Sequence, residues 1–392
     1  MNTPALIKSR IQSIDLLRGI VMVIMVLDHS RNFFHYNGFS EEPTDLATTT
    51  PFLFFTRWVT HFCAPVFIFL SGTSIFLMKN NSIKQKSIFV FKRGLWLVLL
   101  SLTVVAFVWW FDFSFHYLAL DVIWVIGICM ILFAGILYLP FRAILFFGLI
   151  TVAFHNLLDT TNFENGEIQT LLWDLFHHEG LVGISNHFSI FIVYPLMPWI
   201  GVMSLGYCFG KFYKQDFSPE RRKILLLYMG SACILLFVFL RLFTNYGESE
   251  QWRQSPSIFF SLMSFINTTK YPPSLLYLLM TIGPSFIFLS ITETLTHKIA
   301  NFFIVFGRVP FFFYLLHLYL LHLAAFIATL FSYTWNETTQ SLTTMSEFPA
   351  GYGFSLMIVY PIWIATILIL YPICRWYNNY KSTHKNWWLS YV

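Results

Sequence analysis

Long apolar runs separated by short polar segments make up most of the chain. A helix needs roughly 20 apolar residues to cross the ~30 Å hydrocarbon core of a bilayer. The runs are too long for strands, and lipid admits only helices and closed barrels. We therefore predict an all-α, polytopic membrane protein with about ten transmembrane helices, no strands and one membrane-embedded domain, residues 1–392. The predicted spans lie near 14–34, 52–78, 88–110, 117–139, 141–158, 188–210, 223–243, 273–294, 300–331 and 355–377.

Three of these runs have special features. The run at 141–158 is short and contains Asn156. The run at 300–331 is long, and Pro310 predicts a kink in it, because proline removes a backbone hydrogen bond. The run at 14–34 is not a cleavable signal, because charged residues interrupt it and no small-residue cleavage site follows.

The composition also indicates a membrane protein. Hydrophobic residues make up 57% of the chain and charged residues 11%, whereas a soluble domain carries roughly 25% charged residues. A soluble core of this size could not bury so much apolar surface. The five cysteines lie in or beside apolar segments without CxxC spacing, which is typical of small core residues.

Basic and acidic residues are distributed unevenly along the loops. Most of the 24 lysine and arginine residues lie near the two chain ends and in alternate loops such as 79–92 and 211–223. The long loops 35–51, 159–187 and 244–272 are acidic. Cytoplasmic loops are enriched in Lys and Arg. The distribution therefore predicts that both termini are cytoplasmic, and it explains the net charge of +5 without a nucleic-acid partner.

Ionisable residues are most concentrated in the first apolar run, IDLLRGIVMVIMVLDHSRNFF. Arg18 and His29 are 11 residues apart, so they share one helix face about 16 Å apart along the axis. Intramembrane ionisable residues are costly and often functional; the alternative is a snorkelling arginine and an interfacial histidine. Asp28 points about 100° away from His29. A group from another helix, or Asn32, is therefore expected to orient the imidazole.

Three further clusters combine polar side chains with apolar runs. The clusters comprise Asp45, Arg57 and His61; Asn267, Lys270 and Tyr271; and Arg308, Tyr314, His317 and His322. Each also has a purely structural explanation. The first could cap a helix at the membrane interface, the second could cap a loop, and the third could serve helix packing. Histidine pairs at i, i+4 with a carboxylate nearby do not occur, so no metal site is expected. Nucleophile-elbow, Walker and dinucleotide glycine motifs are also missing from the sequence.

These motifs resemble those of a known family. The chain is similar to the heparan-α-glucosaminide N-acetyltransferase-like membrane acyltransferases, in their bacterial branch. The spacing of Arg18 and His29 also resembles the Arg/His signature of the related acyltransferase-3 group. The resemblance covers nearly the whole chain and rests on IDLLRGIVMVIMVLDHSRNFF, FFTRWVTHFCAPVFIFLSGTSIFL, YPLMPWIGVMSLGYCFG, NTTKYPPSLL, FGRVPFFFYLLHLYLLH and CRWYNNYK.

The resemblance implies acyl transfer across a bacterial inner membrane. A cytosolic acetyl-CoA or other acyl-CoA is the expected donor, an amino or hydroxyl group of a sugar or glycan is the expected acceptor, and no metal is needed. This chain departs from the heparan enzyme at two positions that bear on which residue is the catalytic base. The catalytic histidine of the heparan enzyme lies in the following outer loop, where this chain has His35, and that enzyme has an acid near the position of His61.

The residues and the resemblance together give each side chain an expected role. His29 removes the acceptor's proton or carries the acyl group, and His61 is the alternative base. The catalytic set is His29, His61 and Asp28; the acyl-CoA set is Arg18 and Arg308; the acceptor set is Asp45, Arg57, Asn267, Lys270, Tyr271 and His317.

Two other functions stay open at this point. A transporter or flippase would explain polar residues on both sides, but it predicts inverted repeats, which the sequence does not show. A purely structural subunit leaves the buried charges unexplained. The sequence leaves open the acceptor, the acyl length, N- against O-acylation, direct transfer against an acyl-histidine, and whether the chain forms a homodimer.

Overall fold

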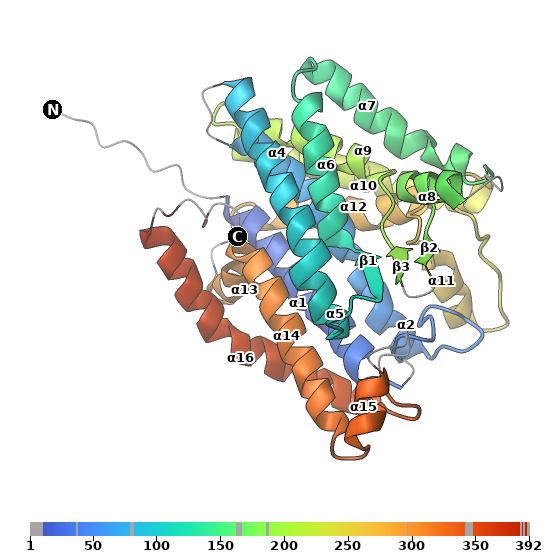
Figure 1. Cartoon of the computed structure of the whole chain (residues 1–392). Coiled ribbons are helices and arrows are strands. Elements are labelled where there is room, and N and C mark those ends of the chain that lie inside the picture. Colours follow the sequence, from blue (N-terminus) through green and yellow to red (C-terminus); the bar gives the residue numbers. More distant parts are fainter. Residues whose placement is uncertain are drawn as a thin grey trace.

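The computed structural model describes residues 11–36, 38–78, 82–161, 167–185, 188–295, 297–341, 348–384, 386 and 389. Helices form most of this part of the chain (Figure 1). The first half contains α1 (Gln12–Phe34), α2 (Pro51–Trp58), η1 (Val59–Phe62), α3 (Cys63–Leu77), α4 (Ile83–Leu100), the π-helical turn η2 (Ser101–Val105), α5 (Ala106–Trp110), α6 (Val122–Ile136), α7 (Phe141–Phe154), η3 (His155–Leu158) and α8 (Glu167–Phe176). The second half contains α9 (Trp199–Phe209), η4 (Gly210–Tyr213), α10 (Pro219–Phe243), α11 (Ile258–Ile266), α12 (Leu275–Thr292), α13 (Lys298–Arg308), α14 (Pro310–Thr329), α15 (Trp335–Ser341) and α16 (Leu356–Thr383).

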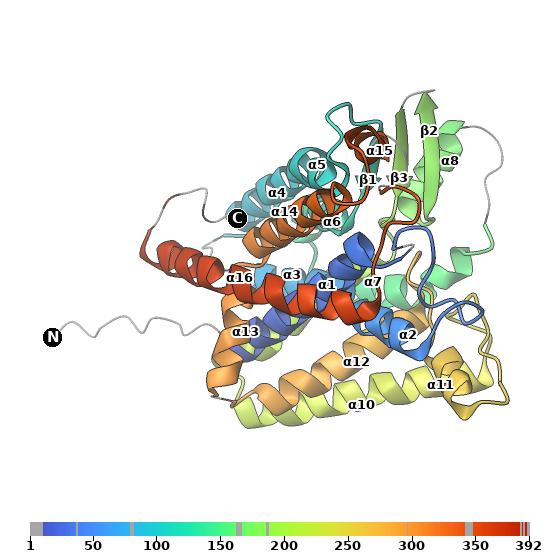
Figure 2. The ribbon, with the colours of Figure 1, turned by 90° about the horizontal axis from the view of Figure 1, so that it is seen from below.

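Helix α1 lies at the centre of the bundle. Most of its residues are buried, and it packs against α3, α12, α13, α14 and α16. Around it, α4 pairs with α6, and α10 pairs with α12 (Figures 1 and 2). A helix that is apolar on several sides and carries charged residues must direct those charges toward protein partners. The central position of α1 therefore places its ionisable residues inside the bundle.

Two glycines bring α1 and α13 into close contact. A Cβ atom at Gly19 would overlap the backbone carbonyl of Phe303, and one at Gly307 would overlap that of Asp15. Any larger residue would push the two helices apart. The crossing therefore brings the residue after Gly307, Arg308, next to the first turns of α1.

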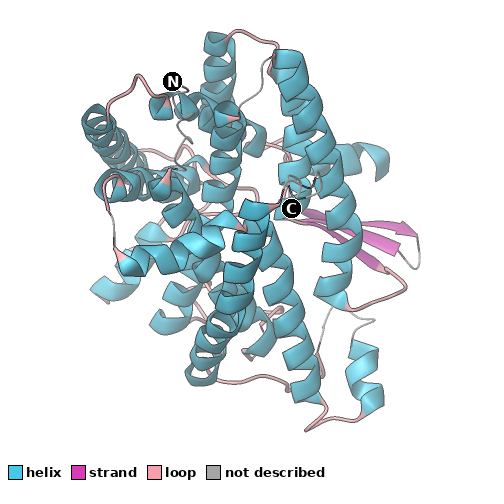
Figure 3. Cartoon of the chain, turned by 90° about the vertical axis from the view of Figure 1, so that its left-hand side faces the viewer, coloured by secondary structure: helices cyan, strands magenta, loops and turns pink. Residues whose placement is uncertain are grey.

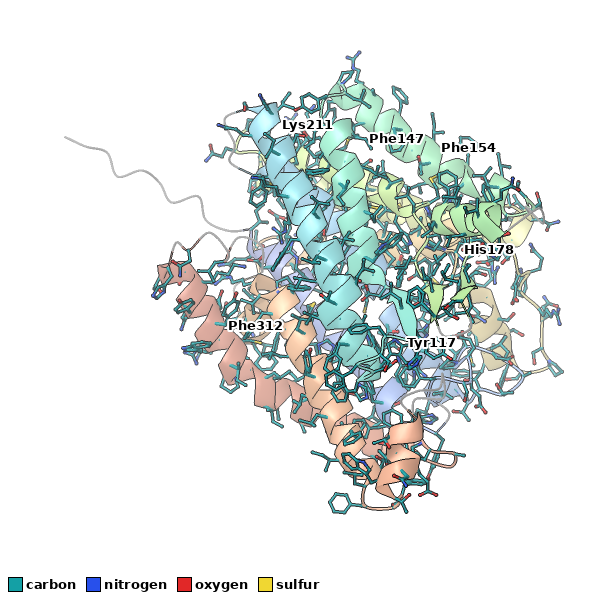
Figure 4. The ribbon with its side chains drawn as sticks, in the orientation of Figure 1. Tyr117, Phe147, Phe154, His178, Lys211 and Phe312 are labelled. Carbon is teal, nitrogen blue, oxygen red and sulfur yellow. The ribbon has the colours of Figure 1, made fainter. Side chains whose placement is uncertain are left out.

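Seven helical segments of the described chain are long and apolar enough to cross a membrane. They are Pro51–Leu77, Ile83–Trp110, Phe141–Leu158, Pro219–Phe243, Leu275–Thr292, Pro310–Thr329 and Leu356–Thr383. Exposed aromatic side chains on α7, among them Phe147 and Phe154, lie on the outside of the bundle, as expected for a surface in lipid (Figure 4). These features are those of a polytopic helical membrane protein. About ten spans and cytoplasmic termini stay predictions.

Several predicted spans have a different structure. Helix α1 is long, but it carries four charged residues: Asp15, Arg18, Asp28 and Arg31. The run at 300–331 forms two helices rather than one kinked helix, because Pro310 begins α14 at a position that tolerates proline. The runs at 117–139 and 188–210 each begin with a strand.

The predicted absence of strands is wrong. Strands β1 (Tyr117–Leu120), β2 (Gly180–Ser185) and β3 (Phe188–Ile192) form a small sheet in the order β1-β3-β2 (Figure 3). Strands β1 and β3 are parallel, with Tyr117 opposite Ser189, and β2 is antiparallel to β3. Hydropathy could not reveal these strands, because short apolar strands that precede apolar helices read as one continuous run.

Candidate active site

A cavity of about 280 Å³ lies at the end of α1 that carries His29. Residues of α1, α2, α3, α5, α6, α14, β1 and β3 line it, together with residues of the loops that follow α1, β3 and α11. Five residues of the expected catalytic and acceptor sets meet here: Asp28, His29, Arg57, Lys270 and Tyr271. A pocket with a few convergent polar groups is the usual form of a small-molecule site.

His29 and His317 are in direct contact inside the bundle. The Nδ1 atom of His29 lies 2.7 Å from Nε2 of His317, and the two rings are stacked with centroids 5.0 Å apart. The Nδ1 atom of His317 lies 2.8 Å from the backbone oxygen of Phe313, one turn earlier in α14. The group that holds the His29 imidazole therefore comes from another helix. Asn32 contacts Arg31 instead.

The Phe313 carbonyl determines which ring nitrogens carry protons in the neutral pair. A carbonyl oxygen can only accept, so Nδ1–H of His317 donates to it. A neutral imidazole has a single N–H, so Nε2 of His317 accepts a hydrogen bond from Nδ1–H of His29. The lone pair of His29 is then on Nε2. Because His29 lines the cavity, this arrangement suits a proton acceptor.

Aromatic side chains surround the His29 ring. Trp109 makes an edge contact with it at a centroid distance of 5.0 Å, and Tyr314 does so at 6.2 Å. The Tyr314 hydroxyl donates to Oδ2 of Asp121 at 2.9 Å, and Ser101 donates to Oδ1 at 2.7 Å. Asp121 is not among the residues predicted from the sequence, although an acid directly before an apolar helical run is an N-cap signal.

A buried ion cluster lies beside the imidazole. Arg57 donates to Oδ2 of Asp28 at 2.5 Å, and Arg31 lies 3.4 Å from Oδ1. The Nε atom of Arg57 lies 3.6 Å from Glu42, whose side chain is largely exposed. Asp28 therefore holds α1 against α2 and neutralises charge inside the bundle; it makes no direct hydrogen bond to His29 within the described residues.

The loop between α11 and α12 brings Lys270 and Tyr271 to the same cavity. Glu248 holds this loop, because its carboxylate accepts hydrogen bonds from the Thr269 backbone and from the Ser274 hydroxyl at 2.9 Å. The Lys270 ammonium lies 4.9 Å from the centre of the Tyr271 ring. A backbone hydrogen bond from the Ser274 N–H to the Thr269 oxygen, at 3.0 Å, also closes the loop. The loop therefore presents Lys270 on a fixed backbone.

Glu179, in the loop between α8 and β2, is a second residue that the sequence analysis missed. Burial, together with the nearby carboxylate of Glu42, raises the pKa of Glu179 to about 7. The cations Lys270 and Arg57 act on it in the opposite direction. Glu179 does not line the cavity, but Glu42, Lys270 and Arg57, which act on it, do. No motif in the acidic loop distinguishes it from other glutamates.

His61 does not line the cavity, although it follows Arg57 by four residues, about one turn of a regular α-helix. The chain changes at Val59 from α-helix to a 3₁₀ turn with three residues per turn. This change leaves Thr60, rather than His61, facing the cavity. The His61 ring is buried and packs at 5.4 Å against Tyr277.

Asp45 and Asn267 also lie outside the cavity lining. The Asp45 carboxylate accepts a hydrogen bond from the Ala47 backbone at 2.9 Å, as in a turn. The Asn267 side chain donates to the backbone oxygen of Thr44 at 3.0 Å. In the structure both residues shape loops next to the site.

Arg18 and Arg308 lie close together at the opposite end of α1. Arg18 is 3.5 Å from one Asp15 oxygen and Arg308 is 3.4 Å from the other. Neither arginine lines the cavity of His29. The structure thus brings the two residues expected to bind acyl-CoA together, but at a distance from the imidazole.

The described residues contain no group of three or more His, Cys, Asp or Glu side chains that could hold a metal ion. Asp28, Arg31, Arg57 and Glu42 form ion pairs with one another, whereas Lys270 lines the cavity without an ion pair among the described residues. The neutral His29 ring can accept a proton in this arrangement, which is the chemistry of general-base catalysis.

Comparison with known proteins gives a family for the chain. Residues 10–241, more than half of the chain, match the family described as heparan-alpha-glucosaminide N-acetyltransferase, catalytic. The match includes His29 and Arg57, whereas Lys270 and His317 lie beyond it. No individual curated protein was found to match. The chain therefore belongs to the heparan-alpha-glucosaminide N-acetyltransferase catalytic family, a family of membrane acetyltransferases.

Proposed function

We propose that the protein transfers an acetyl or other short acyl group from cytosolic acyl-CoA to an amino or hydroxyl group of a sugar or glycan on the other side of a bacterial inner membrane. The observation that carries the proposal is the buried pair of His29 and His317. The pair leaves the lone pair of the neutral His29 ring on Nε2, and this ring lines a cavity that cations and aromatic rings also line.

His29 has the central role in this reaction. Its Nε2 atom takes the proton of the acceptor while the acceptor attacks the thioester carbonyl. The positive charge that forms on the imidazole lies next to Asp28 in the chain, and His317 keeps its hydrogen bond to Nδ1. His29 then returns the proton to the departing CoA sulfur. An acyl-histidine formed at Nε2 is the alternative route.

The two substrates approach from opposite ends of α1 in this proposal. Arg18 and Arg308 carry charges suited to the phosphates of acyl-CoA, and the pantetheine arm carries the thioester toward His29. Arg57, Lys270 and Tyr271 form the acceptor side of the cavity. Asp45 and Asn267 support the acceptor side through their loops.

The experiment that tests the proposal uses the full chain in lipid nanodiscs. The protein is incubated with labelled acetyl-CoA and a panel of amino and hydroxyl sugars, and labelled product is separated and counted. We expect acetylation of at least one sugar, with release of one CoA thiol per product. The same protein in sealed vesicles tests the alternative, because movement of sugar or lipid across the membrane without thiol release would identify a transporter or flippase.

A further inference from the structure

Lys270 differs from the other cations of the cavity because it has no counter-ion. Arg57 is paired with Asp28 and Glu42, and Arg31 is paired with Asp28. Lys270 lies in no ion pair within 4 Å across the described residues, and its ammonium contacts only the face of a tyrosine ring. An unpaired positive charge on a half-buried side chain thus lines the cavity.

This charge lines the same cavity as the imidazole. Lys270, His29, Arg57 and Arg31 all belong to the lining, and Asp28 pairs with both arginines. Lys270 is therefore the cation of the lining whose charge is left for a bound group.

Acyl transfer develops negative charge that a cation near the base can stabilise. When the acceptor attacks, the new bond forms at the thioester carbon and the carbonyl π electrons move to oxygen, which becomes negative. As this oxyanion collapses, the C=O bond reforms, the C–S bond breaks, and the CoA sulfur receives the proton from His29. A cation held in a water-poor site lowers the energy of the oxyanion more than water does.

We propose that the Lys270 ammonium holds the carbonyl oxygen of the thioester and stabilises the negative charge that develops on it. The proposal rests on the acyl transfer proposed above and gives Lys270 a catalytic role in it. The fixed loop of Lys270 supports the role, because Glu248 and the bond from His155 Nε2 to the Pro273 oxygen, at 2.8 Å, hold the backbone in place. A fixed donor needs no reorganisation during the reaction.

Kinetics of Lys270→Met and Lys270→Arg in the full chain test the proposal. Removing one oxyanion donor lowers kcat by about 10²–10³-fold. We expect Lys270→Met to show this loss with every accepted sugar, charged or neutral, and with little change in KM. Lys270→Arg should lose less, because the charge is kept. Arg253→Met, which removes an exposed cation from the loop before α11, is the matched control and should be unchanged.

Two kinetic outcomes would overturn this role. If Lys270→Met raises KM only for acidic sugars and leaves kcat intact, Lys270 binds an acid group of the acceptor. If its kinetics equal those of the control, Lys270 has no part in the reaction.

A binding measurement tests the same role without turnover. Carboxymethyl-CoA carries a negative carboxylate oxygen one methylene beyond the sulfur, near the position of the thioester carbonyl, whereas acetonyl-CoA carries a neutral ketone oxygen at the same distance. The wild-type protein should bind the anionic analogue more tightly, and Lys270→Met should lose that preference. Equal preference in both proteins contradicts the role of Lys270. Lack of acetyl transfer by the wild-type protein contradicts the proposed function instead.

Discussion

Nδ1 of His29 lies 2.7 Å from Nε2 of His317, and Nδ1 of His317 lies 2.8 Å from a backbone carbonyl. This chain of contacts joins α1 to α14 and specifies the tautomer of both neutral rings. A catalytic imidazole needs a fixed tautomer and orientation, since the wrong nitrogen cannot take the proton. His317 is thus a positioning residue for His29.

The role of His317 can be tested with two substitutions. His317→Gln replaces the accepting Nε2 atom by an amide oxygen that can also accept from His29, whereas His317→Ala leaves no acceptor. Because a misplaced catalytic group can cost about 10²-fold, we expect His317→Ala to lower kcat by that order and His317→Gln to lose less. The pH profile of kcat should shift in His317→Ala, because the partner of the imidazole is changed. Equal losses in both variants with unchanged pH profiles would show that His317 only fills space.

The ion pair between Asp28 and Arg57 gives a prediction about stability. Removing one partner of a buried pair leaves an uncompensated charge and costs about 3–5 kcal/mol. We therefore expect Arg57→Met to lower the thermal unfolding midpoint strongly. Glu42→Gln removes a partner whose side chain is 58% exposed, so it should cost about 0–1 kcal/mol. Thermal unfolding in detergent measures the midpoints of both variants. Similar midpoints would contradict the conclusion that the buried pair of Asp28 and Arg57 stabilises the fold.

Glu179 predicts a pH dependence of stability. Its pKa in the folded protein is raised from the ordinary value of 4.5 to about 7, so folding favours the protonated carboxyl. The protonated carboxyl therefore stabilises the folded protein. This stabilisation is fully present below the ordinary pKa of 4.5 and is lost as pH rises to about 7. Glu42, Lys270 and Arg57 are the charged groups that act on it.

The Glu179→Gln variant isolates this effect. Its amide cannot ionise, so the unfolding midpoint of the wild-type protein should fall relative to that of Glu179→Gln between about pH 5 and 7. Differential scanning fluorimetry across this range measures the difference. A constant difference across the range would mean that Glu179 keeps an ordinary pKa.

The orientation in the membrane can be tested by cysteine labelling. The five natural cysteines are free, and all but Cys233 are buried, so a Cys233→Ala background should label weakly. An impermeant maleimide added to intact cells should label His178→Cys and not Lys214→Cys, because the acidic loop is predicted outside and the basic loop inside. Labelling of Lys214→Cys alone would reverse the predicted topology.

Much of the helical fold could be predicted from apolar run length, because each long run had to satisfy its backbone internally. The sheet could not be predicted in this way. Strands β1 and β3 are short and precede apolar helices, so each strand and helix read as one apolar run. The break at Pro310 was visible, but whether proline bends a helix or begins a new one depends on the packing of α13 against α1.

The site was predicted in part. His29, Lys270 and Tyr271 could be selected because ionisable or polar residues beside apolar runs are rare. Thr60 lines the cavity and His61 does not, because a 3₁₀ turn begins at Val59. The periodicity of an α-helix does not reveal such a turn. Glu179 acquires its raised pKa from residues distant in sequence, so only the folded arrangement identifies it.

The most direct test of the mechanism compares acetyl transfer by His29→Gln, His61→Ala and His178→Gln, each measured as turnover per folded molecule in nanodiscs. His178 lies on the exposed loop after α8 and is the matched control (Figure 4). If His29 is the base, His29→Gln should lose about 10²–10⁴-fold in kcat, while the other two variants keep near-normal turnover. Near-normal turnover of folded His29→Gln, or a selective loss in His61→Ala, would contradict the assignment of the base.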